Sequence, residues 1–132
     1  MSIKVEKIPD IRTIYYILSE PVRVPGDAVI SMTETAAFKK ELGAGKVYRI
    51  LDFTGIDLKF GDMMVGLAME RTHEGGAYDP EVVTIYVGDH DLVRLGVEAL
   101  TKQEQFAGSN VLNLVENREE ALKLVREHLA ES

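Results

Sequence analysis

Apolar and polar positions alternate in blocks along the chain, and the clearest block is a strand-turn-helix unit in its middle. VYRILDF (47–53) predicts a buried strand. Its period of two places Tyr48 and Ile50 on one face and Leu51 and Phe53 on the other. Both faces of this strand are therefore expected to be covered.

A polar turn and an apolar helix follow this strand. Thr54-Gly55 turns the chain, and Gly61-Asp62 precede a helix through Met69 that is apolar on most of its surface. Such a helix is expected to be buried deeply or covered by a partner. Because ligands of open α/β sheets bind beyond the carboxyl ends of the strands, we expect a ligand or partner site at this junction.

Four further runs predict the other strands. Residues 3–8 and 13–20 are expected to pair as a hairpin around residues 9–12, where Pro-Asp interrupts the apolar pattern. VVTIYV (82–87) is a continuous apolar run, which is typical of a central parallel strand. VLNLVE (111–116) predicts the last strand.

The first helix has a clear end and two candidate starts. It is expected to end near Leu42, because Gly43 then stands at C′. Asp27 offers an N-cap after a Pro-Gly break, whereas Ser31 has the capping-box spacing to Glu34. The sequence leaves both starts open.

The remaining helices also carry capping signals. Asp89 is expected to cap the helix after the central strand, and Asn117 the last helix. The resulting order, β-β-α-β-α-β-α-β-α, predicts a mixed, mostly parallel sheet with helices packed on it. We expect a single domain over residues 1–132.

Composition narrows the class of protein. The 132 residues carry a formal net charge of −7, which disfavours binding to nucleic acid and to anionic membranes. No cysteine is present, so disulfides and thiolate metal sites are excluded. Neither a signal peptide nor a membrane-spanning run is visible, and we expect a soluble cytoplasmic protein.

Three stretches together resemble the SpoIIAA-like branch of the STAS group, named after sulfate transporters and anti-sigma-factor antagonists. They are LDFTGID before the apolar helix, VVTIYVGDHDLVRLGVEAL, and EEALKLVREHL after the last strand. The resemblance covers nearly the whole chain. It implies a STAS fold with a four- to five-stranded sheet, and in general no catalytic activity.

The chain departs from the regulated members of that group. In anti-sigma antagonists, a Ser at the start of the helix after the central strand is phosphorylated, and this switches partner binding. The corresponding residues here are Phe60-Gly61-Asp62-Met63, without a hydroxyl, so no phosphorylation site is expected. Asp62 either mimics a permanently charged site or is a plain N-cap carboxylate.

Two binding functions fit the resemblance. The first is a non-enzymatic module acting through protein-protein contacts, including self-association as a homodimer. The second is a carrier of a small apolar, lipid-like ligand in a groove beside the helix after Asp62, since some SpoIIAA-like proteins resemble CRAL-TRIO lipid-binding domains. Adaptable methionines suit such a groove, although core packing explains them equally well. The candidate binding residues are Thr54, Gly55, Asp57, Gly61, Asp62, Met63, Met64, Leu67, Gly88, Asp89 and His90.

Enzymatic chemistry has little support in the sequence. No nucleophile elbow, P-loop or dinucleotide fingerprint is present, and the histidines lack metal-site spacing, so no cofactor or metal is expected. His128 is expected to pack on the last helix and His73 to be exposed. His90 could act as a general base with Asp89, but helix capping with an incidental histidine explains the same residues.

Overall fold

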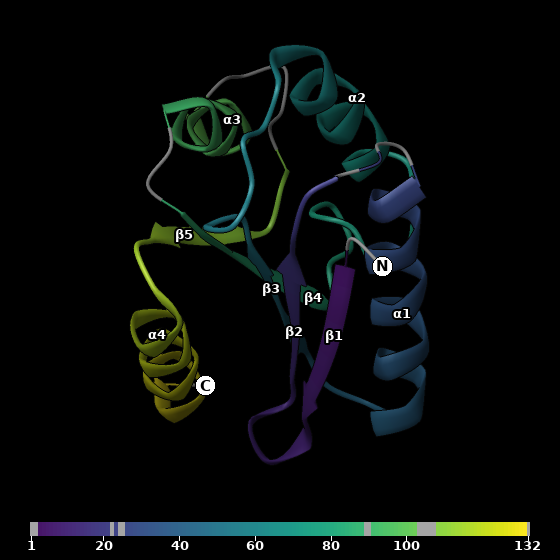
Figure 1. The fold of residues 1–132 in the computed structure, drawn as a ribbon. Coiled ribbons are helices and arrows are strands. Elements are labelled where there is room, and N and C mark those ends of the chain that lie inside the picture. The colour runs from purple at the N-terminus through teal and green to yellow at the C-terminus, as the bar shows by residue number, and fades with distance from the viewer. Residues whose placement is uncertain (1–2, 22, 24–25, 89–90, 103–107, 132) are drawn as a thin grey trace.

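The computed structural model describes residues 3–21, 23, 26–88, 91–102 and 108–131 (Figure 1). Its elements follow the predicted order of strands and helices. They are β1 (Ile3–Ile8), the short 3₁₀ helix η1 (Pro9–Ile11), β2 (Thr13–Leu18), α1 (Gly26–Leu42), β3 (Val47–Asp52), α2 (Phe60–Glu70), β4 (Val82–Val87), α3 (Asp91–Lys102), β5 (Val111–Val115) and α4 (Arg118–Glu131).

The five strands form one sheet in the order β1-β2-β3-β4-β5. β1 and β2 are antiparallel, and each later strand is parallel to its predecessor. The predicted hairpin is confirmed, with η1 as its turn and Arg12 in the left-handed conformation after it. β4 is paired on both sides, as its continuous apolar run predicted.

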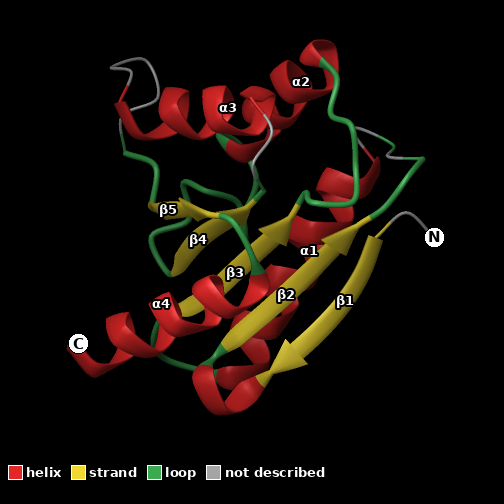
Figure 2. Cartoon of the chain, turned by 60° about the vertical axis from the view of Figure 1, so that its left-hand side comes forward, coloured by secondary structure: helices red, strands yellow, loops and turns green. Residues whose placement is uncertain are grey.

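Helices cover both faces of the sheet (Figure 2). Residues of α1, α2 and α3 share one apolar core with one face of the strands, and residues of α4 share a second core with the other face. In β3, Leu51 faces the three-helix side, whereas Tyr48 and Ile50 face α4, as the period of two predicted. The mixed α/β sheet is thus packed on both sides.

The first helix begins at Gly26, so of the two candidate starts, Asp27 and Ser31, the one at Ser31 is wrong. Ser31 is buried inside α1, where its carbonyl oxygen accepts hydrogen bonds from the hydroxyls of Thr35 and Tyr16. Asp27 lies in the first turn instead of at the N-cap, and its carboxylate accepts from the backbone N–H of Arg23. Tyr16 of β2 thus contacts the backbone carbonyl of Ser31, and the Asp27 carboxylate contacts the segment before the helix.

The observed end of α1 and the observed start of α4 agree with the predictions from the sequence. α1 ends at Leu42, and Gly43 has a φ of 77°. The Asn117 side chain accepts a hydrogen bond from the backbone N–H of Glu120 and caps α4. Asp89, expected to cap α3, lies outside the described residues.

Candidate functional site

A mostly apolar cavity of about 100 Å³ lies between the sheet and helices α1, α2 and α3. Leu18, Leu51 and Tyr86 contribute from the carboxyl-terminal halves of three neighbouring parallel strands. Met63 and Leu67 contribute from α2. The cavity therefore occupies the region where α/β sheets place their ligands, next to the strand-turn-helix unit.

The structure brings some of the predicted residues together at this cavity. Asp62, Met63 and Leu67 line it. Gly88 is buried beside it, because a Cβ on Gly88 would lie 3.6 Å from the Cβ of Phe53, which is a lining residue.

Five other predicted residues do not line the cavity and are exposed. They are Thr54, Gly55, Asp57, Gly61 and Met64. Thr54 has a structural role, since its backbone N–H and its hydroxyl both donate to Asp52 at the end of β3. The backbone N–H of Asp57 donates to Glu20. Asp89 and His90 lie outside the described residues.

The start of α2 differs from one of the two interpretations of Asp62, in which it is the N-cap of this helix. Lys59 is the N-cap residue and makes no side-chain capping bond, so Asp62 lies within the first turn. A carboxylate there still complements the helix dipole. Because Asp62 also lines the cavity, its negative charge adjoins any ligand bound there.

We expected α2 to be buried deeply or covered by a partner, and the structure does not bury it deeply. Among its residues only Met63 and Leu67 are buried. Phe60 is 59% exposed and Met64 is 47% exposed, and on the neighbouring helix α3 Leu95 is 47% exposed. The loops before and after α2 place it over the cavity, so its inner face closes the cavity while its outer face stays open.

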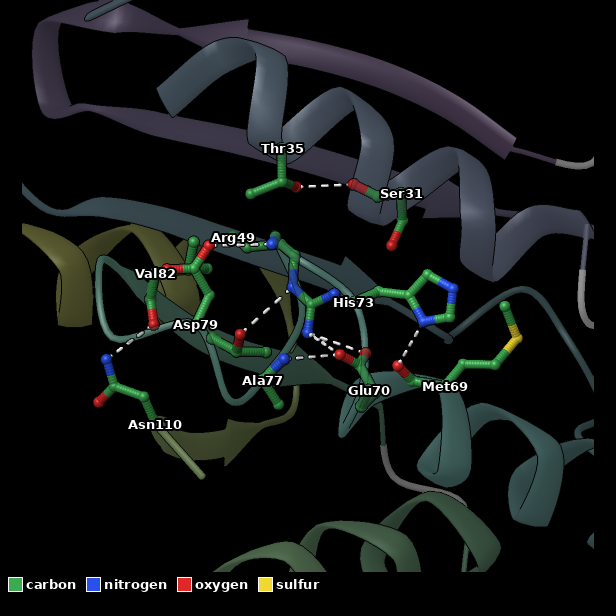
Figure 3. Close-up of polar contacts among 12 residues, drawn as sticks. Ser31, Thr35, Arg49, Met69, Glu70, His73, Ala77, Asp79, Val82 and Asn110 are labelled. Carbon is green, nitrogen blue, oxygen red and sulfur yellow. Dashed lines mark hydrogen bonds and ion pairs between the residues drawn. The ribbon is translucent and has the colours of Figure 1, made fainter. Parts of the chain in front are cut away.

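A buried ion pair borders the cavity, and sequence reasoning missed it. Arg49 is completely buried in β3, and its Nη2 donates to both carboxylate oxygens of Glu70 at 2.8 Å (Figure 3). Its Nε donates to the hydroxyl of Thr84 at 3.2 Å. Glu70 also accepts from the backbone N–H of Ala77 at 2.7 Å. The pair thus ties α2 and the following loop to the middle of the sheet.

The charges of this pair act on the groups around it. Burial alone would lower the pKa of Arg49, but the Glu70 carboxylate outweighs it, and the pKa of Arg49 is raised. Burial, followed by the charge of Glu70, raises the pKa of the Tyr86 hydroxyl. Burial likewise raises the pKa of Tyr16. Both phenols therefore stay protonated and can donate hydrogen bonds across the neutral pH range.

The described histidines play structural roles. The Nδ1 of His128 lies 2.6 Å from the hydroxyl of Tyr48, and the two rings pack edge to face, which confirms that His128 packs on the last helix. His73 is exposed, as predicted, and its Nδ1 lies 3.0 Å from the carbonyl oxygen of Met69. Within the described ranges, no group of three or more histidines and carboxylates is arranged to hold a metal ion.

Comparisons of the chain with protein-family models, with curated proteins and with solved structures gave no match. Over the residues that the structure describes, no helix combines the length and apolar character needed to cross a membrane.

Proposed function

We propose that the protein is a non-enzymatic, STAS-like binding module that holds a small apolar molecule in the cavity beneath α2. The observation that carries the proposal is the cavity itself, which is lined mainly by apolar side chains and lies at the carboxyl ends of β2, β3 and β4. The element order also supports a STAS-like fold.

The volume of the cavity limits the size of the ligand. Drug-sized ligands occupy pockets of roughly 300–1,000 Å³, whereas an apolar cavity of about 150 Å³ in another protein binds benzene. A cavity of about 100 Å³ therefore suits a ligand with a handful of heavy atoms. A larger ligand requires α2 to move outward.

α2 is suited to such a movement. It buries only Met63 and Leu67, and exposing one such side chain costs roughly 1.5–3 kcal/mol. A ligand that covers these two side chains offsets that cost. Elements with few buried contacts belong to the part of a protein that opens most easily.

Cyclopentane is a suitable first probe, because it matches the cavity in size and has no polar group. Gly66 lines the cavity, and a Cβ added there meets no atom within 4 Å, so Gly66→Leu places a side chain where the ligand is expected. Gly61→Leu is the matched control, since Gly61 is exposed on the same helix and does not line the cavity.

We expect saturable amide NMR shifts for Leu51 and Leu67 with the unmodified protein and with Gly61→Leu, and a loss of saturation with Gly66→Leu. Native mass spectrometry of gently purified protein should reveal a bound natural ligand. If cyclopentane gives no saturable shifts in any of the three proteins and no mass co-purifies, the cavity is a packing defect and the proposal fails.

A second candidate function is a protein-protein contact between copies of the chain, through the outer face of α2. It is favoured by the exposed side chains of Phe60 and Met64. Met64→Asp is expected to abolish self-association in analytical ultracentrifugation, whereas Val29→Asp, at an exposed apolar position of α1, leaves it unchanged. A protein that is monomeric at all concentrations contradicts this candidate.

A further inference from the structure

The carboxyl end of α2 is held by buried polar contacts. Glu70, its last residue, accepts two hydrogen bonds of 2.8 Å from Nη2 of Arg49 and one of 2.7 Å from the backbone N–H of Ala77. The loop after the helix is held in turn, because the largely buried side chains of Asp79 and Lys39, which belongs to α1, form an ion pair of 2.7 Å. Breaking one side of a buried pair is strongly destabilising. This end of α2 is therefore expected to stay in place.

The amino end of α2 is held more weakly. Its N-cap residue, Lys59, makes no side-chain capping bond, and the ion pair of Lys59 with Asp57 spans 3.9 Å between exposed side chains. Among the residues that the structure describes, no side-chain hydrogen bond or ion pair joins positions 60–66 to another element. Because exposed pairs contribute little to stability, the amino end of α2 can separate from the protein more easily than the carboxyl end.

The cavity reaches this weakly held end. Its lining there comes from the starts of three helices, with Leu58, Asp62 and Met63 before and within the first turn of α2, Ala28 in α1 and Val93 in α3. An outward swing of the amino end of α2 therefore uncovers the cavity where these helices begin.

An apolar contact closes the cavity at this end. Met63 packs against α3 at Gly96, where an added Cβ would lie 3.2 Å from the Sδ and 3.4 Å from the Cγ of Met63. Apolar contacts are non-directional, so an entering apolar molecule can cover the surface that Met63 leaves. The same exchange is not open to Glu70, because its partner Arg49 is a completely buried cation.

We infer that α2 is a lid that opens at its amino end while Glu70 holds its carboxyl end, and that the ligand enters beneath Met63. This inference rests on the proposed function and adds to it the route of entry. Residues 57–59 serve as the hinge, since residues at the ends of elements absorb such changes in backbone angle. At 1.5 Å per residue, Met63 lies about 10 Å from Glu70 and Leu67 about 4.5 Å, so a swing moves Met63 roughly twice as far.

Single thiols test the direction of opening. The chain has no cysteine, and Met63 and Leu67 are both 8% exposed, so Met63→Cys and Leu67→Cys form a matched pair. We expect iodoacetamide to alkylate the Met63→Cys protein about tenfold faster, after each rate is divided by that of the same variant unfolded in urea. Adding Glu70→Ala to both variants should bring the two rates together, because the carboxyl end is then released as well.

A reversible cross-link tests the route of entry. In Met63→Cys combined with Gly96→Cys, the new sulfur on α2 takes the place of the Met63 Cγ, 3.4 Å from the Cβ added on α3, which is within reach of a disulfide. The rates at which cyclopentane binds and leaves are measured by NMR exchange between its free and bound signals. We expect oxidation to slow both rates about tenfold or more and to leave the dissociation constant unchanged, because a closed lid blocks passage in both directions. A reducing agent should restore both rates in the same sample.

The outcomes distinguish the two proposals. Equal rates in the oxidised and reduced double variant mean that the ligand enters elsewhere, which overturns the inference and leaves the proposed function standing. Equal alkylation of the two single-thiol variants also overturns the inference, because α2 then separates as a whole. If the disulfide does not form, the alkylation rates decide alone. Absence of cyclopentane binding to the unmodified protein overturns the proposed function and, with it, the route of entry.

Discussion

Removing Glu70 tests whether the buried ion pair holds α2 to the sheet. In Glu70→Ala the guanidinium of Arg49 loses two contacts of 2.8 Å, and the backbone N–H of Ala77 loses its acceptor. Arg49 is completely buried and the Glu70 side chain is only 13% exposed, so solvent replaces these contacts poorly. Breaking one side of a buried pair costs about 3–5 kcal/mol, which is a large part of the roughly 5–15 kcal/mol that stabilises a domain.

Urea denaturation at pH 7 measures this loss as a lower midpoint. Glu74→Ala is the matched control, because Glu74 also contacts a cation, Lys39 at 2.9 Å, but its side chain is 66% exposed. Exposed pairs contribute about 0–1 kcal/mol, so the control is expected to change little. The double variant with Arg49→Met and Glu70→Leu should recover most of the stability, because no unpaired charge remains. If Glu70→Ala is as stable as Glu74→Ala, the pair does not anchor α2 and the reasoning is refuted.

Two further tests examine the contact between α1 and the loop after α2. Gly75→Ala is expected to lower the free energy of unfolding by about 2 kcal/mol or more, since Gly75 has a φ of +86° and a Cβ there would lie 2.2 Å from the carbonyl oxygen of Met32. Thermal unfolding of Gly61→Ala, where a Cβ meets nothing, provides the control, and equal stability of the two would contradict this packing. Low pH should also lower the stability that the loop after α2 contributes through Asp79. Burial acts to raise the pKa of Asp79, but hydrogen bonds from Lys39 and from backbone N–H groups outweigh it, and the pKa lies below its ordinary value of 3.8. Because this pKa is lower in the folded state, the stabilisation is present above about pH 4 and is lost as the pH falls through the folded value. Urea midpoints at pH 7 and pH 3 should therefore differ less in Lys39→Met than in the unmodified protein.

Sequence periodicity predicted the order of the elements because buried positions recur at the strand or helix period along them. β3 is buried on both faces, and its alternation was visible in VYRILDF. The start of α1 was not decidable, since Asp27 and Ser31 both carry capping side chains and only the structure shows that Ser31 is buried within the helix. A polar side chain in a helix cannot be assigned to a cap or to a tertiary contact until its neighbours are known.

The sequence indicated the region of the cavity but only part of its lining. The junction after β3 was identified from the position of a turn beyond a buried strand, and Asp62, Met63 and Leu67 do line the cavity there. Glycine and hydroxyl residues of the turn were included because they border the junction in sequence. In the structure the Thr54 hydroxyl donates a hydrogen bond to Asp52, and Thr54 does not line the cavity.

The buried ion pair beside the cavity joins two residues that are far apart in the chain. Arg49 and Glu70 are 21 positions apart, and each is a charged residue at the edge or centre of an otherwise apolar segment. That contrast was the available signal: a charge inside a buried strand must find a partner, and the end of the apolar helix supplies one. A guanidinium has more donors than one carboxylate can satisfy in the geometry seen here, since Nη2 donates to both oxygens of Glu70 and Nη1 has no partner among the described residues. If stability alone had shaped this position, a pair of apolar residues would fill it at no greater cost. The buried, unpaired donor is therefore the feature of this ion pair that stability alone does not explain.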